Sequence, residues 1–240
     1  MATPDVTSFL EAELQHLHVS LSTPHFRELI PPMHVAYNAG WEAVPKGTDL
    51  LVGQLLLLCH RAFLVAVSII ARAHPDDAAG TTRRAIEVAK FAFAVCHDPE
   101  NLNRWLAYKE RTERWEARHQ GQKPKRFAVH LNVPRPHELL DQLDSLLGIE
   151  SDAAVHFTPE YINNYDFERR ADHGFFSYFV TDRDHIERTL RGCVATHIII
   201  LRTFNEALKG AFQHSQPWCQ AMQDIHTAGL RLHPSPAIER

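Results

Sequence analysis

The longest apolar run, residues 50–71, constrains the fold more than any other feature of the sequence. It holds 22 residues, and only Arg61 among them is charged. A charge in the middle of a membrane span costs at least about 2.5 kcal/mol, and Gln54, His60 and Ser68 add further polar groups. A helix that is apolar over most of its circumference belongs at the centre of a bundle. We therefore predict a buried core helix over 48–73 and expect no membrane partner.

Apolar residues recur at helical spacing along nearly the whole chain, and neither Asn-Gly nor Asp-Gly hairpin signals occur. The pattern predicts an all-α fold, a multi-helix bundle that forms a single domain over residues 1–233, with a flexible tail at 234–240. Residues 119–135 break the pattern and are expected to form a loop. Residues 150–181 break it as well, and there the Phe175–Phe179 stretch fits either an extended or a helical fragment. The predicted helices are 5–20, 34–44, 48–73, 76–96, 99–118, 137–147, 184–212 and 217–229.

Composition excludes several classes of protein. Lysine and arginine number 25 against 29 acidic residues, a net charge of −4 that does not suit a general nucleic-acid binder. The sequence contains no Gly-rich phosphate loop, no GxSxG and no HExxH, which argues against P-loop NTPases, Rossmann enzymes, α/β-hydrolases and zincins. The N-terminus lacks a signal-peptide pattern, and the four cysteines form no CxxC pair, so we expect a reducing cytoplasm.

Three polar residues fall on apolar helix faces: His60, Arg84 and His197. A buried imidazole or charge without partners costs several kcal/mol, so such groups must meet one another, other polar groups or a ligand. They are our candidates for ligand binding in a polar pocket inside the bundle. The alternative is that each histidine is satisfied by a neighbouring hydroxyl or carbonyl, while Arg84 extends to water.

A second candidate ligand-binding cluster consists of Asp152 and His156, which are four residues apart and precede Pro159. On a helical turn this spacing places both side chains on one side, where Asp152 could orient His156 as a general base. The alternative is a capped helix end that packs on the core. Geometry is needed to choose between the two.

The stretch TTRRAIEVAKFAFAVCHDPENLNRWL, residues 81–106, resembles a signature of bacterial all-helical HEPN-like proteins of unknown function. In that signature an Arg and a Glu are four residues apart on an apolar helix, and an Asp-Pro helix start and a Trp follow. The AVHF segment around His156 is similar to a Ser…Val-His stretch of the same proteins, although Ser151 lies one residue further away than expected. The resemblance covers about half of the chain. The matching residues are Arg83, Glu87, Asp98, Pro99 and Trp105.

Kinship with HEPN proteins implies an Arg-x(4–6)-His ribonuclease motif, which Arg191 and His197 match with five residues between them. His156 is a further catalytic candidate. Two other Arg/His pairs match the same spacing, which is the frequency expected by chance for a chain with 17 histidines. Helical geometry also separates Arg191 from His197 by about 120°.

Metal and nucleic-acid sites have weaker signals. Glu13 with His16, and Asp182 with His185, have the spacing of di-iron ligands in bundles, but the helix over 48–73 has no carboxylate after Asp49. The basic run 109–126 fits a nucleic-acid arm or, preferably, a solvated helix with internal ion pairs. Near the C-terminus, an amphipathic helix should dock on the body or on a second subunit through Trp218, Met222 and Ile225.

The leading hypothesis from the sequence is a non-catalytic binding or interaction protein with an interior polar pocket. It is expected to be a homodimer that takes a small molecule or a protein partner and needs no metal or cofactor. A metal-independent HEPN-type ribonuclease of a defence or toxin system is the first alternative, and a metal-dependent bundle oxidase is the second. Nucleic acid as a partner is not favoured.

The predicted helix faces generate a mutational test. The His197→Asp substitution should strongly lower the free energy of unfolding, because it would bury a carboxylate on an apolar face. The Lys90→Asp substitution should have little effect, as surface changes usually do. Urea unfolding of both variants checks the assignment, and equal losses of stability would mean that the helix faces are wrong.

Overall fold

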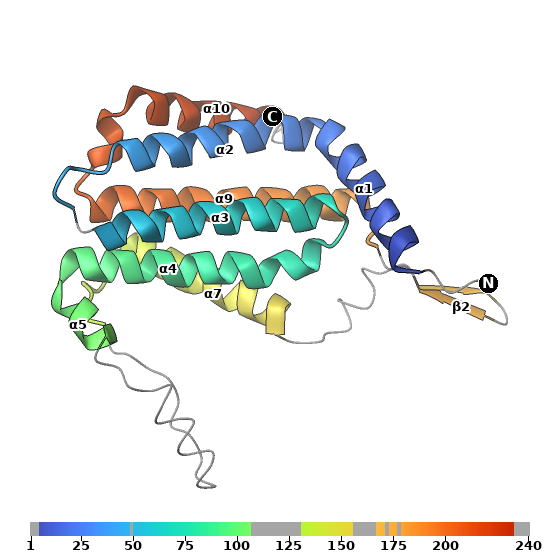
Figure 1. The fold of residues 1–240 in the computed structure, drawn as a ribbon, viewed down its shortest axis with the longest axis horizontal. Coiled ribbons are helices and arrows are strands. Elements are labelled where there is room, and N and C mark those ends of the chain that lie inside the picture. Colours follow the sequence, from blue (N-terminus) through green and yellow to red (C-terminus); the bar gives the residue numbers. More distant parts are fainter. Residues whose placement is uncertain are drawn as a thin grey trace, which may run out of the picture.

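The helices of the computed structural model pack in layers, with α2 beside α10, α3 beside α9, and α4 beside α7 (Figure 1). The structure describes residues 5–48, 50–106, 131–155, 167–170, 173–176 and 179–232. This arrangement confirms the predicted all-α helical bundle. The helices are α1 (Val6–Ser22), α2 (Pro24–Glu42), α3 (Leu50–Ala71), α4 (Ala79–His97), α5 (Glu100–Leu106), α7 (Glu138–Val155), α9 (Arg183–Ala207) and α10 (Gln216–Leu232), with the 3₁₀ turns η1 (Pro75–Ala78) and η2 (Ala211–His214).

One apolar core runs through the bundle and joins α2, α3, α4, α7, α9 and α10. Its largest fully buried side chains include Phe63, Ile86, Leu143 and Phe204. Helix α3 is long and apolar enough to cross a membrane by composition, but 56% of its most apolar window is buried inside the bundle. It is therefore a core helix, as the sequence predicts.

Helix α2 is longer than the predicted helix at 34–44. The prediction began after Pro31 and Pro32, because a proline in a helix interior costs about 3 kcal/mol. The structure continues the helix through both prolines, back to Pro24 in the first turn. Helix α2 packs along α10 over this half, and apolar burial there offsets the cost of the prolines; an exposed ion pair between Arg231 of α10 and Glu28, at 2.6 Å, adds little. The buried residues of this first half are Phe26, Leu29 and Met33.

Helix α9 ends at Ala207, five residues before the predicted end at 212. Lys209 and Gly210 both have positive φ, 57° and 81°. The Gly210 N–H donates to the Asn205 carbonyl at 2.7 Å and the Lys209 N–H to the Glu206 carbonyl at 2.9 Å, which is the Schellman pattern of helix termination. The sequence does not mark this helix end clearly, because the first left-handed residue after the helix is Lys209 and the glycine comes one position later.

One other predicted boundary is wrong: helix α7 extends to Val155, well beyond the predicted end at 147. Within the segment 150–181, β1 (Phe167–Arg170) and β2 (His173–Phe176) form an antiparallel hairpin in which Phe167 pairs with Phe176. Of the two alternatives for Phe175–Phe179, the extended one therefore holds at Phe175 and Phe176. β1 and β2 are the only strands in the part of the chain that the structure describes. Residues 107–118 of the predicted helix 99–118, the loop 119–130 and the tail 234–240 lie outside the described residues.

Lys90 differs from the sequence-based expectation. Its ammonium group forms an ion pair with Asp144 of α7, and both side chains are partly buried. An aspartate at this position would face the Asp144 carboxylate, so Lys90→Asp is not the silent change that the sequence predicts.

The contact between α2 and α3 generates a test with two glycines. A Cβ added to Gly53 would come within 2.6 Å of the Trp41 ring, whereas a Cβ on Gly192 in α9 meets nothing within 4 Å. Replacing glycine by alanine in an open helix position gains about 0.5–1 kcal/mol. We expect Gly192→Ala to raise the free energy of unfolding and Gly53→Ala to give no gain or a loss, measured by urea unfolding. Equal gains would contradict the packing of Trp41 on α3.

Candidate functional site

The two histidines predicted to face the interior do so. His60 on α3 is 9% exposed and His197 on α9 is fully buried. Between them lies Tyr37 of α2, which is 1% exposed. The Tyr37 ring stacks on His60 with centroids 4.7 Å apart, and its hydroxyl lies 2.6 Å from Nδ1 of His197. Tyr37 was not predicted, because the helix signal at 34–44 gave no reason to single out one residue of its face.

The cluster has a consistent hydrogen-bond direction from the surface inward. Asn38 Nδ2 donates to Nε2 of His34 at 3.1 Å, so Nδ1 of His34 carries the hydrogen and donates to Nε2 of His60 at 3.0 Å. Deeper in the core, the Tyr37 hydroxyl and Nδ1 of His197 share a hydrogen bond of 2.6 Å. Nε2 of His197 has no partner in the described part of the chain. This cluster (Asn38, His34, His60, Tyr37 and His197) joins α2, α3 and α9.

Burial keeps both inner histidines neutral. It lowers the pKa of His197 to about 3, and the neighbouring His60 contributes in the same direction. Burial likewise lowers the pKa of His60 to about 4, with a further contribution from His34. Burial also raises the pKa of Tyr37 well above its ordinary value. At neutral pH none of these three groups carries a charge, so their mutual contacts are hydrogen bonds and ring stacking rather than ion pairs.

The cavity between α9 and α10, the two cavities beside Lys209 and the groove between α3 and α4 are lined by neither His60 nor His197. The predicted interior polar pocket is therefore none of these four. Arg84 does not join the histidines: it is exposed and lines the groove between α3 and α4. Of the two alternatives for Arg84, the structure therefore selects the second, in which its long side chain extends from the flank of α4 to water.

The other predicted site residues lie apart from this cluster. Arg191 lines a cavity between α9 and α10, and is separated from the buried His197, so the structure does not bring the proposed ribonuclease pair together. Asp152 belongs to the last turn of α7, and its side chain is not described. His156 lies outside the described residues.

The predicted metal ligands have other partners. Glu13 accepts a hydrogen bond from His74 at 3.2 Å, and His16 packs on Phe179. Asp182 caps α9, and His185 binds Asp76 at 3.1 Å. In the described part of the chain no three His, Cys, Asp or Glu side chains group as metal ligands.

A cavity of about 400 Å³ lies between α9 and α10. Leu29 of α2, Val194 and Ile225 are buried and form its inner lining, while Arg191 and His226 are its only titratable residues. No described carboxylate pairs with Arg191. We call this cavity the α9–α10 pocket; its other lining residues are Ala195, Ile198, Met222, Gly229, Leu230 and Leu232.

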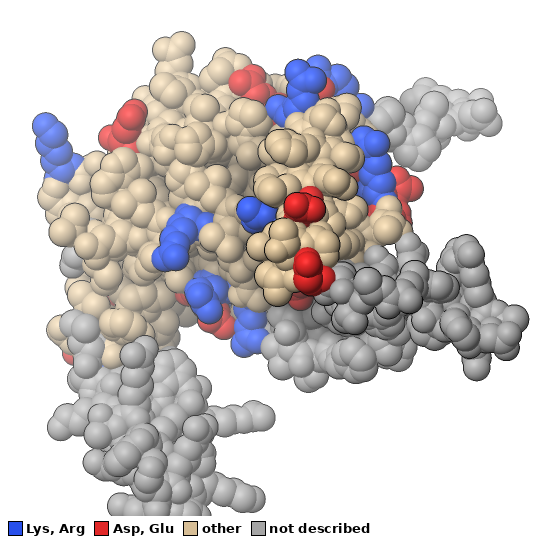
Figure 2. Space-filling view, turned by 45° about the vertical axis from the view of Figure 1, so that its right-hand side comes forward, with Lys and Arg blue, Asp and Glu red and all other residues tan. Residues whose placement is uncertain are grey.

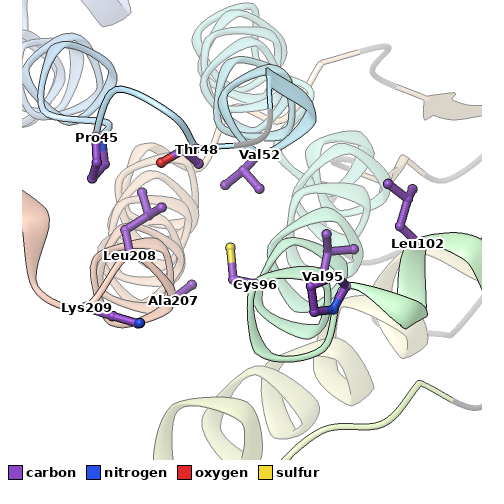
Figure 3. Close-up of a pocket in the computed structure, with 10 residues that line it drawn as sticks. Pro45, Thr48, Val52, Val95, Cys96, Leu102, Ala207, Leu208 and Lys209 are labelled. Atoms are coloured by element: carbon purple, nitrogen blue, oxygen red, sulfur yellow. The ribbon is translucent and has the colours of Figure 1, made fainter.

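A second cavity, of about 330 Å³, lies at the loop end of the bundle, where the ends of α4 and α9 meet the start of α3 (Figure 3). In Figure 3 the Cys96 thiol points into the space between Val52 and Ala207. Its single charged lining residue is Lys209. We call this cavity the end pocket.

Lys209 also lines a third and larger cavity, of about 790 Å³, beside the N-terminus of α7. Its lining mixes polar and apolar residues and carries both signs of charge: Arg202 and Lys209 together with Glu138 and Glu206. Glu206 is bound by His137 at 2.8 Å. The indole N–H of Trp218, another lining residue, is buried and has no partner among the described residues.

Helix α10 docks on the body of its own chain. Trp218 and Ile225 are buried against the core, and Met222 is partly buried there. Of the two alternatives that the sequence left open, the structure therefore selects the intramolecular one.

Comparison with known proteins finds no matching family model, no similar curated protein and no similar solved structure. The case for a function therefore rests on the geometry of the chain itself.

The lowered histidine pKa values generate a pH test. In the unfolded chain both imidazoles titrate near pH 6.5, so below that pH the unfolded chain binds protons that the folded chain excludes. Stability conferred by the neutral histidines is thus present above pH 6.5 and is lost as the pH falls toward the folded pKa values of about 4 and 3. Each histidine contributes at most about 1.4 kcal/mol per pH unit.

We expect His60→Gln and His197→Gln each to flatten the fall in unfolding free energy between neutral pH and about pH 5. Chemical denaturation at a series of pH values measures the slope, whatever the stability of each variant at neutral pH. Burial raises the pKa of Glu150 to about 7, so this carboxyl group stabilises the folded chain as the pH falls, opposite to the histidines. Its contribution is the same in wild type and in both variants, so it cancels when their slopes are compared. Slopes equal to that of wild type would show that the two imidazoles are not held neutral.

Proposed function

We propose that this protein is a non-catalytic binding module that takes a small amphiphilic anion in the α9–α10 pocket. The observation that carries the proposal is an apolar cavity of ligand size with one guanidinium at its wall. Ligand pockets typically measure about 300–1,000 Å³ and combine apolar walls with a few polar groups. At about 400 Å³ the α9–α10 pocket is within this range.

The chemistry of the lining indicates the class of ligand. Leu29, Val194 and Ile225 offer a dry apolar floor for a hydrocarbon body. The Arg191 guanidinium presents donors in a fork that matches a carboxylate or a phosphate, and no described carboxylate competes for it. Such a ligand has an apolar body and one anionic end.

The lining also supports binding without catalysis. It contains no hydroxyl, thiol or carboxylate side chain that could act as a nucleophile, and its only titratable groups are Arg191 and His226. The buried His197, which the ribonuclease hypothesis requires, is out of reach of a large polymeric substrate. No observation on the described residues favours an enzymatic alternative.

The finer expectations from the sequence remain part of this proposal. A HEPN-like kinship is compatible with the all-helical bundle and with the ion pair between Arg83 and Glu87 on α4, in which Nε of Arg83 lies 3.2 Å from Oε1 of Glu87. A bacterial cytoplasmic location is compatible with the four cysteines, all of which are free thiols.

Binding of decanoate, a linear fatty acid, tests the proposal by isothermal titration calorimetry. We expect decanoate to bind wild type, and Arg191→Gln to weaken binding about tenfold or more, since a charge-assisted hydrogen bond contributes roughly 1.5–3 kcal/mol. Decanol, which has the same body and no charge, should bind both proteins alike.

The end pocket supplies a matched control, because it also has an apolar lining and a single cation. Lys209→Asn removes that cation and keeps a residue that tolerates positive φ. This variant should bind decanoate as wild type does. Absence of decanoate binding to wild type, or a loss of binding in Lys209→Asn in place of Arg191→Gln, would contradict the proposed site.

A further inference from the structure

Helix α3, the most apolar of the described helices, exposes one face to solvent. Along α3, Leu50 is 69% exposed, Leu57 44% and Leu64 42%. These three leucines are seven residues apart and therefore lie in one row. Leu58 at 48% and Val65 at 39% form a second row about 100° around the helix, and the exposed Gln54 and Arg61 lie between the two rows. The sequence predicts a helix that is enclosed on most sides, and the exposed leucines of α3 depart from that prediction.

Neighbouring helices extend the apolar face on both sides. Trp41 of α2 is 39% exposed and its ring lies over Gly53 of α3. On the other side, α4 contributes Val88 and Ala85 to a groove of about 210 Å³ that Leu58 and Val65 also line. We call the six large residues Trp41, Leu50, Leu57, Leu58, Leu64 and Val65 the α3 face.

The charge pattern of the α3 face resembles that of an interface core. Helix α3 contains no Asp, Glu or Lys, and its single charged residue is Arg61. Arg61 and Arg84 both line the groove between α3 and α4, and no described carboxylate pairs with either. Interface cores are enriched in aromatic residues and Arg and depleted in Lys, Glu and Asp. In Figure 2, which views this side of the bundle obliquely, wide uncharged areas separate the few charged groups.

The area of the α3 face matches what a stable dimer needs. At these exposed fractions the six side chains present on the order of 500 Å² of apolar surface, near the upper limit of the largest patch on a typical monomer, about 300–600 Å². A standard interface takes about 800 Å² from each partner, of which about 65% is apolar in homodimers. Those figures correspond to roughly 500 Å² of apolar surface per partner.

From these observations we infer that the α3 face is the surface through which two copies of this chain pair. A second copy presents the same face, so one isologous contact buries two equal apolar surfaces and leaves neither exposed. Arg61 lies between the two apolar rows and Arg84 at their edge, so in this contact each stem covers apolar area while each guanidinium extends toward solvent. The interface lies on α3 and is separate from the α9–α10 pocket, so this inference does not depend on the proposed ligand.

Sedimentation equilibrium of the full-length chain over a wide concentration range tests the inference. We expect wild type to be a dimer, and the double variant Leu57→Glu with Leu64→Glu to raise the dimer dissociation constant at least about tenfold. Salt should have a small effect on wild type, because the contact is mainly apolar.

Helix α1 provides a matched control. Leu14 and Leu21 have the same spacing as the tested pair and are 51% and 47% exposed. The double variant Leu14→Glu with Leu21→Glu should dimerise as wild type does, and circular dichroism confirms that both variants are folded. A monomeric wild type, an undiminished dimer in the α3 variant, or an equal loss in the α1 variant would overturn the inference. A folded α3 variant that is monomeric beside a dimeric α1 variant supports it.

Discussion

The hydrogen bond between Tyr37 and His197, with His60 stacked on the phenol, determines how the central helices are rotated. Each of the three side chains comes from a different helix, and each is almost completely buried. An unpartnered polar group at this depth costs roughly 1–3 kcal/mol, so a rotation of α2, α3 or α9 that separates them is strongly disfavoured. The contact therefore fixes the rotation of these three helices relative to one another, which the apolar contacts of the remaining core do not fix because they have no preferred direction.

The outward surfaces follow from this alignment. With His197 facing inward on α9, Arg191 lies six residues earlier and about 120° around the helix, which directs it toward α10. On α3, the row of Leu50, Leu57 and Leu64 lies about 40–80° around the helix from His60 and faces solvent beside the contact with α2. The proposed ligand pocket and the proposed dimer face are thus both consequences of where three polar side chains meet.

Helical periodicity predicted the fold class and the inward position of His60 and His197, because a 3.6-residue pattern records which face of a helix is buried. It could not predict Tyr37 as the partner, since α9 follows α2 by about 140 residues and only packing brings Tyr37, His60 and His197 together. The pattern could not choose between the two alternatives for Arg84 for a related reason: it locates a Cα, whereas a long side chain reaches several ångströms beyond it.

The apolarity of α3 has a consequence for the timing of folding. Its partner α9 is completed only after 136 further residues, from 71 to 207, have been synthesised. At about 5–20 residues per second this takes roughly 7–27 s. During that interval α3, the most apolar of the described helices, lacks the face of α9 that covers it in the folded bundle, so more of its apolar surface stays in contact with water.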